Sequence, residues 1–342
     1  MVGGKGIKCR SPLLMNDGTH QEAMRYIHDR LGRELILKLH KENYIYDALA
    51  MLLIWITLFV LIYLLGSLPI GWIWFCCFIL QGFVLQLLGF CSHDLFTHRR
   101  VGGPLIARIG SILCLTPLLV SATAVMKTHL EHHRYFGTEN DSEAYKRDLD
   151  RRWVKFFFLS LPGILLVTSR KLSRQSTGES AYMGKARYQD AEIVKKISSE
   201  QKIIIIFLVC LLGLAFVWPS YILSGYFMPL FFALPLASTL RTILEHADIQ
   251  PNNPYNSSTN YKTGPVSRLL FFWDSGDCHI VHHFFPAIPF YRISDALQLM
   301  SPIFQEQGAI EQRSIAKILY GWFIENKTHG TNWLQSAQQK HG

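Results

Sequence analysis

Histidines are the residues in this sequence whose type and spacing could do chemistry. Fourteen are present, and nine of them fall in four short segments: HDLFTH, HLEHH, LEHAD and HIVHH. In each H-x-x-H-H segment the three imidazoles share one face of a helix, because residues three and four apart are neighbours there. Such a face presents several nitrogens to a metal ion. We therefore predict nine metal ligands: His93, His98, His129, His132, His133, His246, His279, His282 and His283.

The number of these histidines and their directions predict two metal ions. His93 and His98 are about 140° apart on a regular helix, so they cannot aim at one point unless the helix unwinds or a wide cavity separates them. That divergence suits two metals. Imidazole binds iron, zinc, copper and nickel, so ligand type leaves the metal open. One tetrahedral zinc would use four ligands, whereas the nine histidines are enough for two ions with positions left for oxygen.

Acidic residues beside the histidines are candidates for orienting them. A metal-bound imidazole usually donates its second N–H to a carboxylate or a carbonyl. Each candidate would serve equally well as a helix cap or an ion pair. The acidic neighbours are Asp94 and Asp277, which we favour, and Glu131, Glu245, Asp248 and Asp274. Arg241 ends an apolar run, where we expect it to reach lipid headgroups or, alternatively, the polar head of a substrate.

Membrane helices are the elements that must position these residues. The chain is 49% hydrophobic and 17% charged, and residues 48–92 and 203–240 contain no Asp, Glu, Lys or Arg. Each run is about twice the ~20 residues that one spanning helix needs. Turn signals near the middle of each run, at residues 66–69 and 218–225, divide it into a hairpin. We predict an all-α membrane fold with four spanning helices in two hairpins, at about 47–91 and 203–240, capped by a cytosolic helical domain.

The positive charges predict the orientation of these helices. Residues 1–45 carry eight Lys or Arg and the two inter-helix turns carry none, so the histidines are expected on the cytosolic side. The net charge of +9 suits anionic lipid or an acidic redox partner. No motif for nucleic acid or for direct nicotinamide binding appears, so a separate electron donor is expected.

The chain is expected to divide into three segments. These are a cytosolic or interfacial N-terminal segment (1–45), a membrane domain (46–300) and a cytosolic tail (301–342). Residues 20–42 predict an amphipathic helix lying on the membrane. Residues 104–125 and 153–167 are shorter apolar stretches, expected at the interface. The basic stretch 169–202 favours a solvated loop or, alternatively, a docking surface for a donor or lipid.

At the histidine segments the chain resembles the membrane fatty acid desaturases of the histidine-box di-iron superfamily. The order H-x4-H, H-x-x-H-H, H-x-x-H-H falls on His93/His98, His129/His132/His133 and His279/His282/His283, and DCHIVHHFFPAIPFY is similar to acyl-lipid desaturases. The resemblance covers roughly residues 45–300. It implies two non-haem irons, O2 as co-substrate and an external donor: a ferredoxin, rubredoxin or b-type cytochrome. His246 corresponds to an additional ligand in relatives of acyl-CoA desaturases, although their Asn one turn earlier is Thr242 here.

The resemblance implies a fatty acid desaturase, an O2-dependent oxidoreductase that introduces a double bond into an acyl chain. A hydroxylase, ketolase or oxidative decarboxylase of the same superfamily is the alternative, because these enzymes share the metal chemistry. A histidine-lined metal or haem transporter is a further alternative, but the uncharged hairpins disfavour it. We expect a multi-pass protein with its active site on the cytosolic side, in a bacterial inner membrane.

Overall fold

The computed structural model describes residues 17–135, 190–246, 254–256, 277–309 and 314–324, together with residues 258, 260, 261, 263, 264 and 268. Every regular element in these residues is a helix, and one isolated bridge joins Asn260 to Cys278. The apolar stretch 153–167, most of the basic stretch, Asp248 and Asp274 lie outside the described residues.

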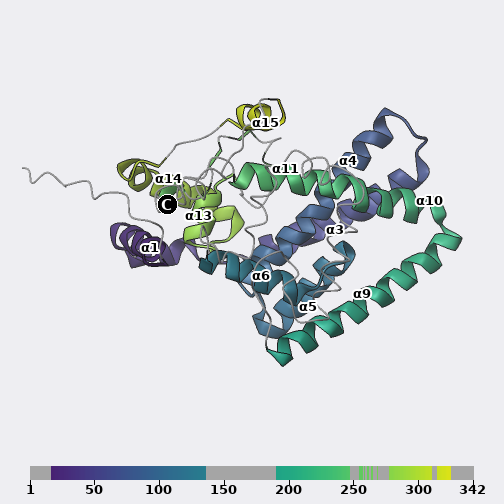
Figure 1. The fold of residues 1–342 in the computed structure, drawn as a ribbon, viewed down its shortest axis with the longest axis horizontal. Helices are drawn as coiled ribbons and strands as arrows, with labels where there is room; N and C mark the ends of the chain where they lie inside the picture. Colours follow the sequence, from purple (N-terminus) through teal and green to yellow (C-terminus); the bar gives the residue numbers. More distant parts are fainter. Residues whose placement is uncertain are drawn as a thin grey trace, which may run out of the picture.

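Long apolar helices dominate the described part of the chain (Figure 1). Four segments there are long and apolar enough to cross a membrane, as the uncharged runs predict: Arg33–Ser67, Trp72–His98, Ala191–Val217 and Pro219–Arg241. They comprise α3 (Tyr44–Ser67), α4 (Trp72–Cys91) with the π-helix η1 (Ser92–His98), α9 (Ala191–Val217), and α10 (Pro219–Ile222) with η4 (Leu223–Phe227), η5 (Pro229–Ala233) and α11 (Leu234–His246). Large apolar side chains such as Phe59 and Ile206 are exposed along their outer faces, which suits contact with lipid.

The two hairpins pack closely through α4. A Cβ added at Gly82 of α4 would lie 2.4 Å from the backbone carbon of Ala233, so only glycine permits this approach. Leu85, Leu88 and Leu230 are fully buried in the resulting core. The packing holds α4, which continues directly into η1, against the second hairpin.

A bent pair of helices follows η1. It consists of α5 (Gly103–Leu115), the short η2 (Thr116–Leu118) and α6 (Ala122–Tyr135), and the second arm is bent by 101° from the first. Leu119, with φ 57°, makes the bend. The pair covers the stretch expected at the membrane interface, and it would count as a fifth span if it crossed as one unit.

A carboxylate from α9 holds the start of α6. Glu200 is buried and accepts hydrogen bonds from the Ser121 hydroxyl (2.5 Å), the Thr123 N–H (2.9 Å) and the Thr123 hydroxyl (2.6 Å). A carboxylate at a helix N-terminus satisfies free N–H groups and complements the helix dipole. This contact fixes the helix that carries HLEHH.

The N-terminal helices pack against protein. Gly32, with φ 78°, separates α1 (Asp17–Leu31) from α2 (Arg33–Leu39). Their buried residues, Ile27, Ile36 and Leu39, join one core with α13 (His279–Phe284) and α14 (Phe290–Glu306). The stretch expected as a single amphipathic helix is thus two helices, and their buried apolar residues pack against α13 and α14. Figure 1 shows α1, α13 and α14 gathered at one end, away from α9 and α10.

The remaining described elements complete this end of the molecule. They are η6 (Pro254–Asn256) and α15 (Ile315–Phe323). Arg30 of α1 pairs with both carboxylate oxygens of Glu306 at 2.8 and 3.0 Å, so α1 is joined to the end of α14. The expected boundary at residue 300 falls inside α14, and the boundary at residue 45 falls in the first turn of α3.

Candidate metal centre

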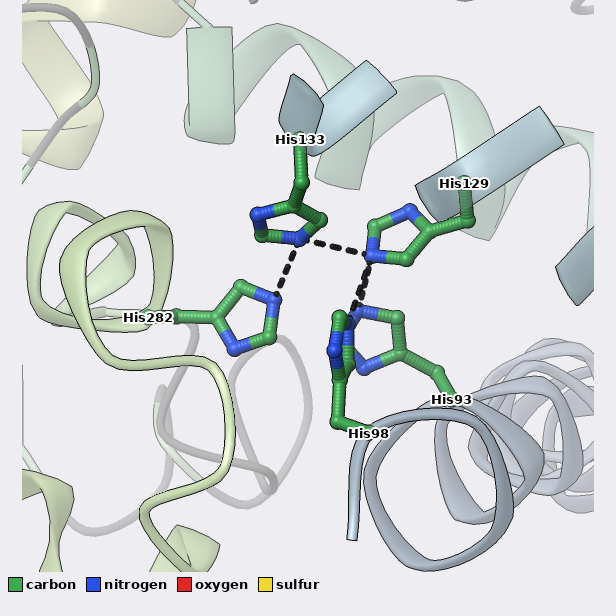
Figure 2. Close-up of side chains that lie close together, drawn as sticks. All are labelled: His93, His98, His129, His133 and His282. Carbon is green, nitrogen blue, oxygen red and sulfur yellow. Dashed lines mark hydrogen bonds between the residues drawn. The ribbon is translucent and has the colours of Figure 1, made fainter. Parts of the chain in front are cut away.

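Five of the predicted ligands converge on one point (Figure 2). They are His93 and His98 of η1, His129 and His133 of α6, and His282 of α13, here called the first histidine group; one nitrogen from each lies within 4.8 Å of all the others. The Nε2 atom of His129 lies 2.8 Å from that of His93, 2.9 Å from that of His98 and 2.8 Å from that of His133. His133 Nε2 is 3.1 Å from His282 Nε2.

This crowding of nitrogens fits a metal ion. An imidazole Nε2 takes part in one hydrogen bond, either as donor or as acceptor, but His129 Nε2 faces three other nitrogens. A metal bound to imidazoles at about 2.1 Å would place neighbouring nitrogens about 3 Å apart. Burial and the neighbouring imidazoles hold the pKa values of His133 and His282 well below their usual range, which keeps them in the neutral form that binds metals.

The direction of His93 and His98 differs from the expectation. They lie in one group because η1 is underwound: the Arg99 N–H bonds to the Asp94 carbonyl five residues back, at 3.2 Å. In this register residues five apart lie one above the other. The expectation that the two side chains diverge is wrong. Their direction is therefore no evidence for a second metal.

Three further histidines form a second histidine group beside the first: His132, His279 and His283. His283 Nε2 lies 3.2 Å from His279 Nε2, and the rings of His132 and His283 have centroids 5.2 Å apart. Each H-x-x-H-H segment thus gives its first and last histidines to one group and its middle histidine to the other. His246 is the last residue of α11, and its side chain lies outside the described part of the structure.

Glu245, one of the predicted orienting residues, approaches a histidine of the second histidine group. Its Oε1 lies 3.5 Å from Nδ1 of His279 and 2.5 Å from Nε of Arg241. Arg241 is 3% exposed, and its guanidinium carbon lies 3.7 Å above the ring of Phe90. This arginine therefore faces the protein interior and does not extend outward to headgroups.

The other acidic candidates have different surroundings. Asp94 pairs with Arg99 at 3.1 Å, and Asp277 accepts from Arg268 at 2.7 Å and from the Thr263 hydroxyl at 2.5 Å. These contacts fix the backbone beside His93 and His279. Glu131 is half-buried on α6.

Sequence reasoning did not identify several residues that hold the ligands in place. Glu200 anchors α6, and Arg99 pairs with the residue after His93. His20 of α1 stacks on Phe284 with ring centroids 4.8 Å apart, and its Nε2 lies 3.3 Å from the His283 carbonyl. Glu200 and Arg99 lie three and seven residues from the nearest uncharged run, and no spacing in the sequence distinguishes them from other charges there. No sequence signal linked His20 to α13.

The fold and the site together define a helical protein with candidate membrane spans and a histidine-rich candidate metal centre. The chain belongs to the fatty acid desaturase family: residues 90–314, about two-thirds of its length, match the model described as fatty acid desaturase. This range contains all nine predicted ligands. Membership implies an oxidoreductase that acts on lipid or acyl chains. The search of curated proteins finds no match.

Proposed function

We propose that this protein is a membrane di-iron desaturase that converts two neighbouring methylenes of a fatty acyl chain into a double bond. The supporting observation is the meeting of all three histidine boxes in two adjoining groups. Two electrons from the substrate and two from an external donor balance the reduction of O2 to two waters. A ferredoxin, rubredoxin or b-type cytochrome fits the donor role.

Each histidine group would hold one iron. His93, His98, His129, His133 and His282 are assigned to one iron, and His132, His246, His279 and His283 to the other. The bound pair would supply the oxidising power that removes hydrogen from an unactivated methylene. Family membership supports iron over the other metals that imidazole accepts,.

The protein would exclude water from this site. His132, His279, His282 and His283 are each less than 8% exposed, and Ile280, Val281 and Phe284 beside them are fully buried. Exclusion of water strengthens electrostatic interactions and prevents side reactions. We place the site at the cytosolic side of the membrane, because the N-terminal segment is basic and the expected inter-helix turns carry no Lys or Arg,.

The test is to express the protein in cells and measure both the iron content of the purified protein and the cellular acyl chains. We expect about two irons per chain and new unsaturated chains. His282→Ala and His132→Ala, which affect one group each, should abolish the product and lower the iron content. His28→Ala is the matched control, because His28 is exposed on α1.

The other outcomes are equally informative. A hydroxylated or shortened product with two irons would overturn the dehydrogenation and favour another reaction of the superfamily. Protein without iron would overturn the di-iron assignment.

A further inference from the structure

Asp94 and Arg99 repeat the relation between His93 and His98. Each pair is five residues apart within or directly after η1, and the pairs are offset by one residue. Arg99 contacts Asp94 twice: its N–H bonds to the Asp94 carbonyl at 3.2 Å, and its Nη1 donates to the Asp94 carboxylate at 3.1 Å. The ion pair and the convergence of the two histidines therefore occur in the same backbone register.

That register is the reason the ion pair can form. On a regular α-helix, residues five apart point about 140° away from each other. An Asp and an Arg at this spacing would face different sides, as would the two histidines. In the underwound η1 the two residues of each pair lie on the same side. The ion pair and the convergence of the two imidazoles therefore both require the π-helical conformation.

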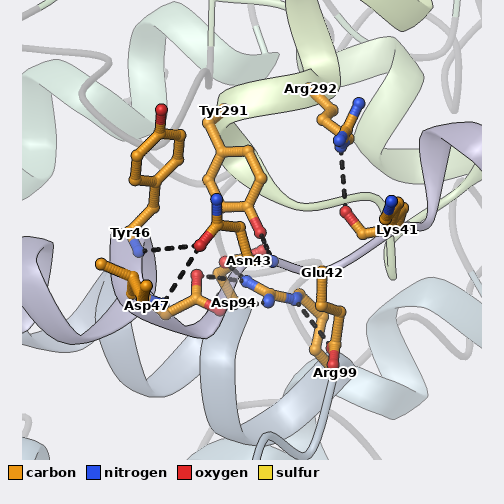
Figure 3. Close-up of polar contacts among 10 residues, drawn as sticks. Lys41, Glu42, Asn43, Tyr46, Asp47, Asp94, Arg99, Tyr291 and Arg292 are labelled. Carbon is orange, nitrogen blue, oxygen red and sulfur yellow. Dashed lines mark hydrogen bonds and ion pairs between the residues drawn. The ribbon is translucent and has the colours of Figure 1, made fainter.

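Arg99 is held from outside η1 as well (Figure 3). Its side chain is 1% exposed, and it pairs with Asp47 at 2.5 and 2.8 Å and with Glu42 at 3.3 Å. These carboxylates belong to the first turn of α3 and to the residues before it. Tyr291 of α14 accepts from the Asn43 N–H at 2.5 Å, and Arg292 donates to the Lys41 carbonyl at 2.9 Å. The guanidinium thus joins η1 to a segment that α14 also holds.

The energetics favour a role for Arg99 in stabilising the π-helical conformation of η1. A π-helical turn is uncommon and persists where its surroundings fix it. A buried guanidinium needs its carboxylate partners, and breaking such a set leaves uncompensated charge in the interior. The pairing with Asp47 and Glu42 therefore fixes Arg99, and Arg99 in turn fixes Asp94 in the underwound register.

We propose that Arg99, acting through Asp94, is a positioning residue that locks η1 in the register where His93 and His98 face one metal ion. The inference rests on the proposed function only in that the first histidine group binds a metal. The second histidine group receives no ligand from η1, so its metal does not depend on this lock.

The experiment measures metal binding to detergent-purified protein that has been stripped of metal and titrated with Co2+. Wild-type protein should bind two ions per chain. Arg99→Gln should bind one ion with unchanged affinity and the other about ten- to a hundredfold more weakly, the usual loss when a residue supporting a ligand is removed. Asp94→Asn should show the same selective loss, and Arg99→Lys a smaller one, because an ammonium retains the charge without the planar fork.

Arg30→Gln is the matched control, because it removes the exposed Arg30–Glu306 pair on α1 and α14 and should leave both ions bound. X-ray absorption at the cobalt edge supplies a second readout: the imidazole count at the weakened site should fall in Arg99→Gln.

Two results would overturn the proposal. One is unchanged binding of both ions to Arg99→Gln; the other is parallel loss of both ions, which would indicate general unfolding. Wild-type protein that binds no metal would instead overturn the proposed function, so the two failures are distinguishable.

Discussion

At the scale of single residues, the contact between Glu245 and His279 makes the end of α11 a support for the second histidine group. A carboxylate near Nδ1 fixes the orientation of an imidazole and raises its basicity as a ligand. Arg241, buried over Phe90, donates to the same carboxylate oxygen that His279 approaches. The three residues connect the fourth candidate span to α13.

Glu245→Gln should therefore affect both stability and metal binding. The substitution keeps the shape but leaves Arg241 without this charge partner, which is expected to lower the free energy of unfolding by about 3 kcal/mol. Affinity for the ion in the second histidine group should fall about tenfold or more. Thermal unfolding and metal titration measure the two effects.

Glu192→Gln provides the comparison for this variant. It breaks an exposed pair with Lys196 on α9 and should change stability by less than about 0.5 kcal/mol. Equal effects of the two substitutions would show that Glu245 has no special role.

The sequence indicates which histidines are candidate ligands, but it does not indicate how the structure groups them. Spacing of three and four residues shows that three imidazoles share a helical face. It does not show that His132 turns from His129 and His133 toward α13. Nor does it reveal the underwinding that brings His93 and His98 together, because that register is set by Arg99 and by contacts from distant segments.

At the scale of elements, α5 supports η1 through a glycine. A Cβ at Gly110 would lie 2.3 Å from the ring of Phe96, which is one residue of η1. The close contact lets α5 pack directly behind the turn that carries His93 and His98. The helix bend at Leu119 then directs α6 to the same site.

Gly110→Ala should displace Phe96 and with it η1. Overpacking of this kind usually destabilises a core by about 1–3 kcal/mol, and we expect weaker metal binding in the first histidine group. Gly213→Ala is the control, since a Cβ there meets nothing within 4 Å and helix propensity favours alanine. If both variants bind metal equally well, Phe96 has room to shift and the support by α5 is unimportant.

Glu200→Ala should weaken both ions together, because α6 supplies histidines to both groups. The loss of three hydrogen bonds at the start of α6 is expected to lower stability by about 1–3 kcal/mol. Metal analysis distinguishes this variant from Arg99→Gln, which should weaken one ion.

Asp190→Ala is the matched control for Glu200→Ala. Asp190 caps its own helix α9 through the Glu192 N–H at 2.9 Å, so its loss removes a cap without touching α6. Retention of both metals by Glu200→Ala would contradict the anchoring role.

The elements themselves were predicted to different degrees. Absence of charge defined the four candidate spans, since composition alone decides whether a helix suits lipid. The covering of α13 by α1 was not predicted, because an apolar helix face does not show whether lipid or protein will cover it. Ile27 and Ile36 pack on α13 and α14, in contacts that span most of the chain.

At the scale of the whole molecule, the histidines join parts of the chain that are far apart. The first histidine group draws its side chains from η1, α6 and α13, and these elements belong to a candidate membrane hairpin, to the bent pair and to the C-terminal helices. Ions bound only by the folded chain stabilise it by mass action. Metal removal should therefore loosen the contact between these parts.

Removal of metal by a chelator should lower the thermal unfolding temperature of purified protein. Free metal at about a hundred times the dissociation constant contributes about 2.7 kcal/mol per site, and adding Fe2+ back should restore the transition. An unfolding temperature that does not depend on metal content would show that packing alone holds the C-terminal helices to the hairpins.

The contact between Glu200 and α6 also links the site to the thickness of the bilayer. The outer face of α9 is largely exposed, with Ile206 and Val209 each 63% accessible, so in a bilayer its tilt is expected to change with hydrophobic mismatch. Because Glu200 of α9 is hydrogen-bonded to the first turn of α6, a change in the tilt of α9 would move His129, His132 and His133 relative to η1. Turnover in reconstituted bilayers should then depend on lipid chain length. An enzyme that alters acyl chains would in that case respond to the bilayer thickness that its own products change.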